Sequence, residues 1–367
     1  MRIVKTTKLE EGMIAAMPVK TKHGQLIVEE GAVLTNQLIA RISFYGIDCI
    51  RIEGEEPKPE VKEPEPPKGN VQEPTYSQRV KKTQEFQKFQ IEYTSSSSEL
   101  SRILEPILSN GTVSKDVLYK TIYPLMDKAR NTIEMFDLLH NMRSVDDSVY
   151  AHSLNVALIC GMFARWLHFS QEDMDDLLLA ALLHDLGKTK IPAEILNKPD
   201  KYTDEEFALV KQHPQMGYDI LNSYPDNVFD SRIKNAALMH HERCDGSGYP
   251  NGLQRDEIDE FAHIIAIADV YDAMTAARSY RAPLCPFQVI AAFEKEGLQK
   301  YHPKYILTFL EKIASTYQRN RVLLSNGQPA DIVMLNKQSL SRPIVQLNGG
   351  ECIDLSRTPD IHIQALL

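Results

Sequence analysis

The sequence predicts a mainly α-helical protein with a small α+β module at its amino end and a small β appendage at its carboxyl end. Apolar residues recur at helical spacing from about residue 149 to residue 317. A segment rich in proline and charge, residues 55–75, separates this helical part from the amino end. After Arg321, short β-prone segments alternate with Asn-Gly turns.

Residues 1–54 are predicted to form the α+β module, which we interpret as regulatory. An apolar segment is followed by a helical pattern, a glycine that ends the helix and the strand-like run IDCIRI. Residues 55–75 then contain six prolines among alternating charges, so they are predicted to be an extended linker without a core. The residues that carry the pattern of the module are Leu26, Ile27, Val28, Leu38, Ile39, Ile42, Tyr45 and Gly46.

Residues 76–145 are predicted to form connecting helices, because apolar residues such as Ile122, Leu125 and Ala129 keep helical spacing. The serine run 95–98 and Pro106 are expected to interrupt this pattern. Two roles stay open for these helices, namely pairing two copies of the chain or covering the core of the next domain.

Residues 146–320 are predicted to form one all-helical catalytic domain. Its apolar stripes, such as Val156, Ile159 and Phe163, are separated by loops rich in Gly, Pro and Asp. Residues 321–367 are predicted to be the β appendage, in which the turns LSNGQ and QLNGGE lie between RVLL, DIVML, PIVQL and CIDL.

Composition limits the partners and the compartment. The net charge of -9 without a local basic patch disfavours a DNA or RNA partner. The five cysteines are far apart and form no CxxC pair, which fits a reducing, cytoplasmic setting. No apolar stretch has the length of a signal peptide or of a membrane span, and the strongest one, Leu177–Leu183, ends at His184.

Histidines and aspartates interrupt apolar helices at several points. His152 lies on the apolar stripe of its helix, where a lone histidine is usually a hydrogen-bonded core residue. In AALLHDLGK, however, an apolar helix runs directly into His184 and Asp185 before Gly187 breaks it. Burying an ionised aspartate beside an imidazole is costly unless a cation or strong donors accompany it. A metal ion would meet that requirement.

Asp269 raises the same question within the apolar run IIAIADVYDAM, and Asp272 follows on a similar face. A helix cap, or a buried ion pair with Arg278 or Arg281, would equally explain Asp269. His240 and His241 are adjacent near a helix end, and His213 comes from another segment. Adjacent helical side chains diverge by roughly 100 degrees, so this pair suits a two-metal site or a distorted helix end.

Imidazole and carboxylate ligands suit Fe, Mn or Zn, and a bridging aspartate favours two ions. Such a pair of ions lowers the pKa of a shared water, and the resulting hydroxide can attack phosphorus in line. The residues therefore predict a two-metal phosphoester hydrolase.

Five segments in this order resemble the HD-GYP family of cyclic di-GMP phosphodiesterases. They are HSLNVA at 152, LLHDLGKTKIP at 182, KQHPQMG at 211, HHERCDGSGYPNG at 240 and IIAIADVYDAMT at 264. The resemblance covers roughly residues 149–314 and implies an HD-type helical catalytic domain in bacterial second-messenger signalling. It implies two divalent metal ions, preferably Fe or Mn, with Zn, Ni, Mg or Ca as alternatives in isolated protein. One ion would be held by His152, His184, Asp185 and Asp269, and the other by Asp185, His213, His240 and His241, with Asp185 as the bridge.

The resemblance also implies substrate contacts. Lys188, Arg278 and Arg281 would bind the phosphates, although solvated surface charges are the ordinary reading of such residues. Gly248 would let the backbone approach the ligand, Tyr249 would pack on a guanine and Pro250 would hold the loop, whereas an ordinary turn explains the same glycines and proline.

Three departures from the family pattern bear on these expectations. Ser148 stands where some members carry a glutamate linked to a third metal, so we expect two ions. Cys244 replaces a bulky aromatic residue beside two expected ligands, and packing is a more ordinary role for it than that of an oxidisable thiol. The run ARSYR varies on the family's phosphate-contact pattern, which bears on substrate affinity.

The resemblance implies hydrolysis of cyclic di-GMP to pGpG and further to GMP by a metal-activated hydroxide. Three groups are candidates for protonating the leaving oxygen: Asp272, Lys188 and a metal-bound water. A cyclic di-GMP sensor with little turnover and an HD-type hydrolase of another nucleotide are the alternatives. The partners that it implies besides the substrate are a second copy of the chain, or a diguanylate cyclase or other signalling protein.

Overall fold

The computed structural model describes residues 2–21, 26–35, 38–39, 41–42, 47, 49–53, 80–109, 111, 115–128, 132–142, 149–196, 198, 200–276 and 284–367. The described residues divide into two compact units, one before residue 75 and one from residue 80 to the carboxyl end. Each unit is described by itself.

The amino-terminal unit is built on two short antiparallel strand pairs. Strand β1 (Arg2–Lys5) pairs with β4 (Cys49–Ile52), and β2 (Val19–Lys20) pairs with β3 (Leu26–Val28). The strands expected at 26–28 and within 47–52 are thus confirmed. Of the expected helix, residues 38–39 and 41–42 are helical, whereas Tyr45, Gly46 and the predicted linker at 55–75 lie outside the described residues. The core contains Ala15, Ile27, Val28, Leu34, Ile42, Ile50 and Ile52.

Three helices precede the predicted catalytic domain: α3 (Gln84–Leu108), α4 (Lys115–Lys128) and α5 (Thr132–Met142). The expectation that the serine run and Pro106 interrupt the first of them is wrong, because α3 runs through both. Ser96 and Ser97 are buried with Leu100 and Leu104 on the packed face of α3, and this burial overrides the weak helix propensity of serine. Pro106 lies in the last turn, so the one intrahelical hydrogen bond that its missing N–H removes is near the end of the helix.

The helices that follow confirm the mainly helical fold that the sequence predicts. They are α6 (Val149–Trp166), α7 (Gln171–Leu183), the 3-10 turn η2 (Leu186–Lys190), α8 (Ala193–Leu196), α9 (Asp204–Val210), α10 (His213–Asn222), α11 (Ser231–Met239), the turn η3 (Arg255–Glu257), α12 (Glu260–Thr275), α13 (Pro286–Lys300) and α14 (Pro303–Thr316).

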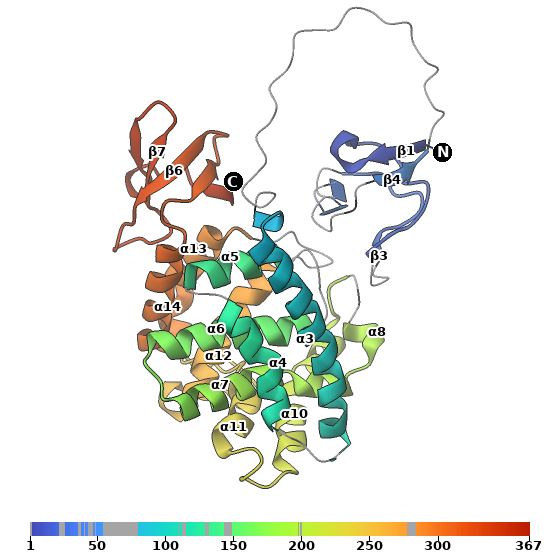
Figure 1. Ribbon diagram of the computed structural model, residues 1–367, viewed down its shortest axis with the longest axis vertical. Helices are drawn as coiled ribbons and strands as arrows, with labels where there is room; N and C mark the ends of the chain where they lie inside the picture. The colour runs from blue at the N-terminus through green and yellow to red at the C-terminus, as the bar shows by residue number, and fades with distance from the viewer. Residues whose placement is uncertain are drawn as a thin grey trace, which may run out of the picture. The chain divides into compact units, whose positions relative to one another are not determined.

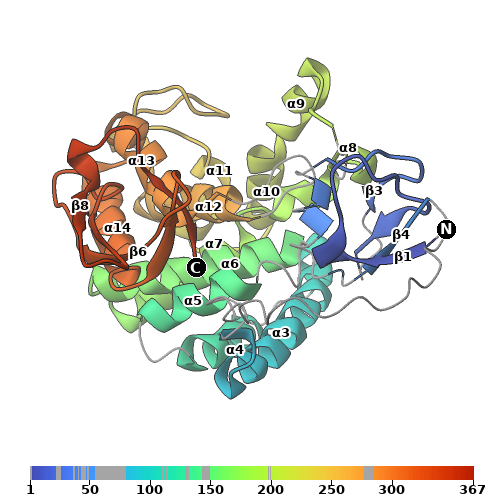
Figure 2. The ribbon, with the colours of Figure 1, turned by 90° about the horizontal axis from the view of Figure 1, so that it is seen from above.

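The packing of this unit places α6, α7 and α12 side by side (Figure 1). Helices α3 and α4 pack against α6, whereas α10 packs on η2 and α11 packs on α7 and α12 (Figure 2). Helix starts are marked by side-chain caps, such as Ser170 at α7 and Asp259 at α12. Of the helices that the structure describes, none is both long and apolar enough to cross a membrane.

The carboxyl end forms a five-stranded antiparallel sheet in the order β8-β7-β6-β5-β9. The strands are β5 (Arg321–Leu324), β6 (Pro329–Met334), β7 (Ile344–Leu347), β8 (Cys352–Asp354) and β9 (Ile363–Leu366). The two turns expected from Asn-Gly are present, with Gly327 and Gly350 at positive φ. Glu294 of α13 accepts hydrogen bonds from the backbone and the hydroxyl of Ser341, which ties the sheet to the helices.

Candidate metal centre

His152 lies on α6 with its side chain 10% exposed, as its place on the apolar stripe predicted. Its Nε2 atom lies 3.1 Å from Asp269 Oδ1 and 3.6 Å from Asp185 Oδ2. Its Nδ1 atom lies 2.8 Å from Asp272 Oδ2. Asp269 and Asp272 both come from α12, so this helix presents two carboxylates to opposite sides of one imidazole.

Three further histidines are oriented by bonds to helix carbonyls. The Nδ1 atom of His184 lies 2.8 Å from the carbonyl oxygen of Ala181. The Nδ1 atom of His213 lies 2.7 Å from the carbonyl oxygen of Val210. The Nδ1 atom of His240 lies 2.9 Å from the carbonyl oxygen of Ala237. Because a carbonyl can only accept, Nδ1 carries the proton in each ring and the Nε2 lone pair is presented to the interior.

Gly187 explains how the end of α7 reaches the start of α10. A Cβ atom at this position would lie 2.0 Å from the carbonyl oxygen of His213 and 2.6 Å from the backbone nitrogen of Gly217. Only glycine leaves room for the two backbones to approach so closely. The glycine that breaks the helix after Asp185 therefore also brings Asp185 beside His213.

The potential ligand atoms form two buried groups, and within each group they lie within 4.8 Å of one another. Asp185 lies between the groups, because its Oδ2 is 3.4 Å from His184 Nε2 and its Oδ1 is 3.3 Å from His213 Nε2. Each oxygen of Asp185 thus faces a different group, and its role as a shared ligand stays a prediction. We call His152, His184 and Asp269 the first cluster, and Asp185, His213, His240 and His241 the second cluster.

The donor set fits divalent cations. His184 Nε2 and Asp185 Oδ1 are buried and have no hydrogen-bond partner among the described residues. The Nε2 atoms of His213 and His240 lie 3.2 Å apart, although both are acceptors when Nδ1 carries the proton. Buried lone pairs without donors are costly, and a cation bound between them removes that cost. The two clusters are thus consistent with a binuclear metal site.

The clusters differ in their protonation. Burial lowers the pKa of His152, but hydrogen bonds and charge from Asp269 and Asp272 outweigh burial and raise this pKa to about 9. Burial, together with the neighbouring histidines, lowers the pKa of His240 to about 4 although Asp185 opposes the shift. Burial also holds the pKa of His241 well below its usual value. His240 and His241 are therefore neutral near pH 7, which is the form that binds metals.

The carboxylates of the site are held in the ionised form. Burial raises the pKa of Asp185, but Lys188 and His184 outweigh burial and bring this pKa well below its usual value. In the same way, His152 outweighs burial at Asp269 and lowers the pKa of that carboxyl group. Lys188 Nζ donates to Asp185 Oδ2 at 2.5 Å, and its side chain is 25% exposed. Its ammonium group thus lies at the open edge of the site.

The residues after His241 form a loop against the second cluster. The Tyr249 ring stacks on the His241 ring with centroids 4.7 Å apart, and the Tyr249–Pro250 bond is cis. A Cβ atom at Gly248 would lie 2.4 Å from Glu242 Cα, so the close approach at this glycine is to the loop's own backbone. We define residues 242–253 as the GYP loop.

Glu242 is a residue that sequence reasoning passed over. Its carboxylate is buried and accepts hydrogen bonds from the backbone N–H groups of Asn251 and Leu253. The only signal in the sequence was a charged residue directly after two expected ligands. Other predicted positions, namely Ser148, Arg278 and Arg281, lie outside the described residues.

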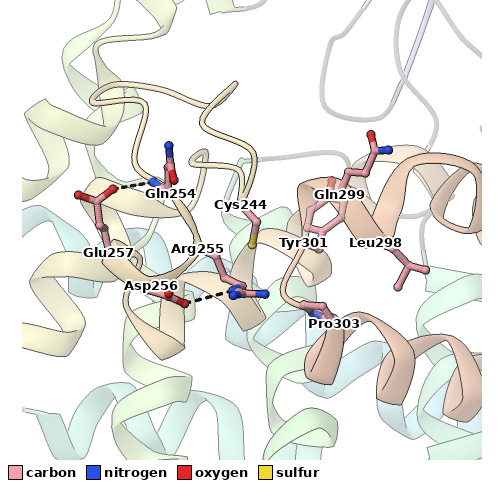
Figure 3. Close-up of a pocket in the computed structure, with 9 residues that line it drawn as sticks. All are labelled: Cys244, Gln254, Arg255, Asp256, Glu257, Leu298, Gln299, Tyr301 and Pro303. Carbon is pink, nitrogen blue, oxygen red and sulfur yellow. Dashed lines mark hydrogen bonds and ion pairs between the residues drawn. The ribbon is translucent and has the colours of Figure 1, made fainter.

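Cys244 contacts a cavity outside the two clusters. It lines a cavity of about 630 Å³ between the outer side of the GYP loop and the turn from α13 to α14, together with residues such as Arg255 and Tyr301 (Figure 3). None of the residues of the two clusters lines this cavity. Burial raises the pKa of the Cys244 thiol, and its sulfur lies 3.9 Å from His263 Nδ1. Cys244 is therefore a neutral thiol away from the metal-binding groups.

The part of the chain that carries the two clusters is similar to known proteins. Residues 129–305 match the HD domain family. The chain is 33% identical over 209 residues to the cyclic di-GMP phosphodiesterase PA4108 of Pseudomonas aeruginosa, an alignment that covers 57% of this chain and 50% of that protein. It is 34% identical over 192 residues to a cyclic di-GMP phosphodiesterase of Thermotoga maritima, covering 52% of this chain and 51% of that protein.

A third relative has a different stated substrate. The chain is 32% identical over 220 residues to 3'3'-cGAMP-specific phosphodiesterase 2 of Vibrio cholerae, covering 60% of this chain and 42% of that protein. The chain thus spans about half the length of the curated relatives that it matches. Residues 129–305 are thus similar to HD domains, and the chain is related to the HD-GYP phosphodiesterases named for cyclic di-GMP or cGAMP.

Proposed function

We propose that this chain is a metal-dependent phosphodiesterase of cyclic dinucleotides, and that it opens cyclic di-GMP to pGpG and then to GMP. The observation that carries the proposal is the pair of buried clusters joined by the two oxygens of Asp185. The motifs on which the clusters lie are those by which the chain resembles phosphodiesterases and fall within the part that matches the HD domain family. Two relatives named cyclic di-GMP phosphodiesterases align with 57% and 52% of the chain.

In this proposal the two clusters hold divalent ions, with Fe or Mn preferred. Bound there, such ions would supply Lewis acidity and would lower the pKa of a water molecule, which is the chemistry that phosphodiester hydrolysis needs. One oxygen of Asp185 faces each cluster. Asp272 orients the His152 ring by its contact with the Nδ1 atom of that ring. Asp272 is engaged in this way and 1% exposed, so we assign it to positioning in preference to proton donation.

Lys188 is the residue best placed to meet the substrate from the protein side. Its ammonium group contacts Asp185 and is partly exposed, so it can offset charge on a phosphoryl oxygen at the edge of the site. It is also a candidate proton donor to the leaving oxygen. The contacts expected from Arg278 and Arg281 remain part of the proposal, as does a cytoplasmic setting.

A second substrate has support, because one relative is named for 3'3'-cGAMP. Protein purified without oxygen, analysed for metal and loaded with Mn or Fe(II) would be given cyclic di-GMP and 3'3'-cGAMP in parallel, with products separated by chromatography. We expect pGpG from cyclic di-GMP at the higher kcat/KM. Faster opening of 3'3'-cGAMP would replace the substrate assignment, and tight binding without any product would contradict the enzyme and support a sensor.

A further inference from the structure

The GYP loop folds back on the end of α11 through contacts on both sides of the His241–Glu242 pair. Tyr249 donates its backbone N–H to the carbonyl oxygen of His241 at 3.3 Å, and its ring stacks on the imidazole. Gly248 packs against the backbone of Glu242. The position of the loop thus decides what covers the second cluster at His241.

The strongest bonds that close this loop come from one side chain. Glu242 Oε1 accepts from the N–H of Asn251 at 2.7 Å, and Oε2 accepts from the N–H of Leu253 at 3.0 Å. Glu242 is only 2% exposed, so water does not replace these bonds without opening the loop. Hydrogen bonds to a carboxylate in such a setting are shorter and stronger than neutral ones.

We infer that Glu242 is a positioning residue whose carboxylate holds the GYP loop closed, with Tyr249 against His241. Asn251 directly follows the Tyr249–Pro250 bond, and Leu253 lies two residues further along the chain. Hydrogen bonds to their N–H groups therefore hold the Tyr249 ring at the edge of the second cluster, against His241. The consequence for substrate binding rests on the proposed function, whereas the closure of the loop does not.

Both oxygens of Glu242 are acceptors, and this is why glutamine is an informative replacement. Glu242→Gln keeps the size of the side chain, but its amide NH2 group faces one of the two backbone N–H donors. One bond is lost and one donor is left unpaired, while the packing stays close to native. Glu257→Gln is the matched control, because Glu257 Oε2 accepts from the N–H of Gln254 at 2.8 Å in an exposed part of the same segment.

The experiment compares full-length wild type, Glu242→Gln and Glu257→Gln, each analysed for bound metal. Hydrogen exchange read by mass spectrometry should become roughly tenfold faster or more in peptides that contain Asn251 and Leu253 of Glu242→Gln. Exchange in α7 and α11 and the metal content should match wild type. With cyclic di-GMP, KM should rise about tenfold while kcat changes less than about threefold, since one charge-assisted bond is lost outside the reacting atoms.

Three results would overturn the inference. The first is unchanged exchange at Asn251 and Leu253, and the second is a faster exchange that Glu257→Gln reproduces. The third is a general rise in exchange with loss of metal, which would make Glu242 a core residue only. If the wild-type protein hydrolyses no cyclic dinucleotide, the proposed function fails. The hydrogen exchange rates at Asn251 and Leu253 still decide whether Glu242 holds the GYP loop closed.

Discussion

The first and second clusters lie side by side but differ in the charge of their histidines. In the first cluster, His152 lies between two carboxylates of α12, which favour its protonated form. In the second cluster, three histidines meet around one oxygen of Asp185, and burial favours neutral rings. Two sites with the same types of ligand can therefore differ, because the number of carboxylates, including those that contact a ligand from behind, sets the charge that a cation would meet.

Asp185 is the residue that joins the two clusters, so its loss should have the largest effect. Asp185→Ala removes the carboxylate whose two oxygens face the two clusters, and we expect bound metal to fall toward zero and turnover to drop by about a thousandfold or more, beyond the ~10–100-fold typical for loss of an outer partner. Elemental analysis and a cyclic di-GMP assay on the same sample test this. Asp219→Asn, an exposed change on α10, should leave both measurements unchanged. Full metal content with full activity in Asp185→Ala would refute the shared site.

Single-cluster variants test whether the clusters can be separated. His184→Ala should empty the first cluster and His213→Ala the second, so each variant is expected to bind about one ion per chain where wild type binds two. Turnover should fall by more than about 100-fold in both, because each variant loses a direct ligand. Metal analysis with a zinc or manganese titration measures the stoichiometry. Loss of both ions in both variants would show that the clusters bind cations only together.

Asp272→Asn tests the carboxylate that contacts the Nδ1 side of His152 in the first cluster. The amide accepts the Nδ1–H of His152 without the negative charge, so we expect the affinity of the first site for metal to fall by roughly 10–100-fold, with the second site unaffected. A competition titration against a chromophoric chelator resolves the two sites. Asp256→Asn, in an exposed turn, serves as the control. An unchanged pair of affinities would show that His152 does not depend on Asp272 for its orientation.

The smallest effect is a pH dependence of stability in protein stripped of metal by a chelator. His152 has a pKa of about 9, so it stabilises the fold below its unfolded pKa and this stabilisation is lost as pH rises toward 9. His240 has a pKa of about 4, so protonation of the unfolded chain lowers stability as pH falls toward 4. Melting curves should therefore give the highest Tm near pH ~6.5, the usual histidine pKa, with shifts of a few degrees on either side.

Two variants separate the acid side from the alkaline side of the dependence of Tm on pH. His152→Gln should flatten the alkaline side and His240→Gln the acid side, because each removes one of the titrating rings. A wild-type profile without a maximum, or a profile that neither variant changes, would contradict the electrical difference between the clusters.

Much of the site could be predicted from local patterns. The end of the apolar helix α7 at His184, the orientation of His152 and the β-turns at Gly327 and Gly350 all follow from spacing and residue type. The continuity of α3 through its serines could not be predicted in this way, because the helix is stabilised by packing that its own sequence does not reveal. Glu242 was missed for a similar reason, since its partners are backbone groups of a loop that folds back on it.

The kinds of ligand, their order along the chain and the helices that carry them could be predicted from the amino-acid sequence, because helical periodicity and the cost of burying charge are local properties. The family resemblance already implied how the ligands divide around Asp185, whereas the folded structure supplies the distances, with one oxygen of Asp185 toward each cluster and Asp272 against His152 Nδ1. Those distances depend on the packing of α6, α7, α10, α11 and α12 and on the close approach at Gly187. They join residues far apart in the chain, and no local pattern encodes them.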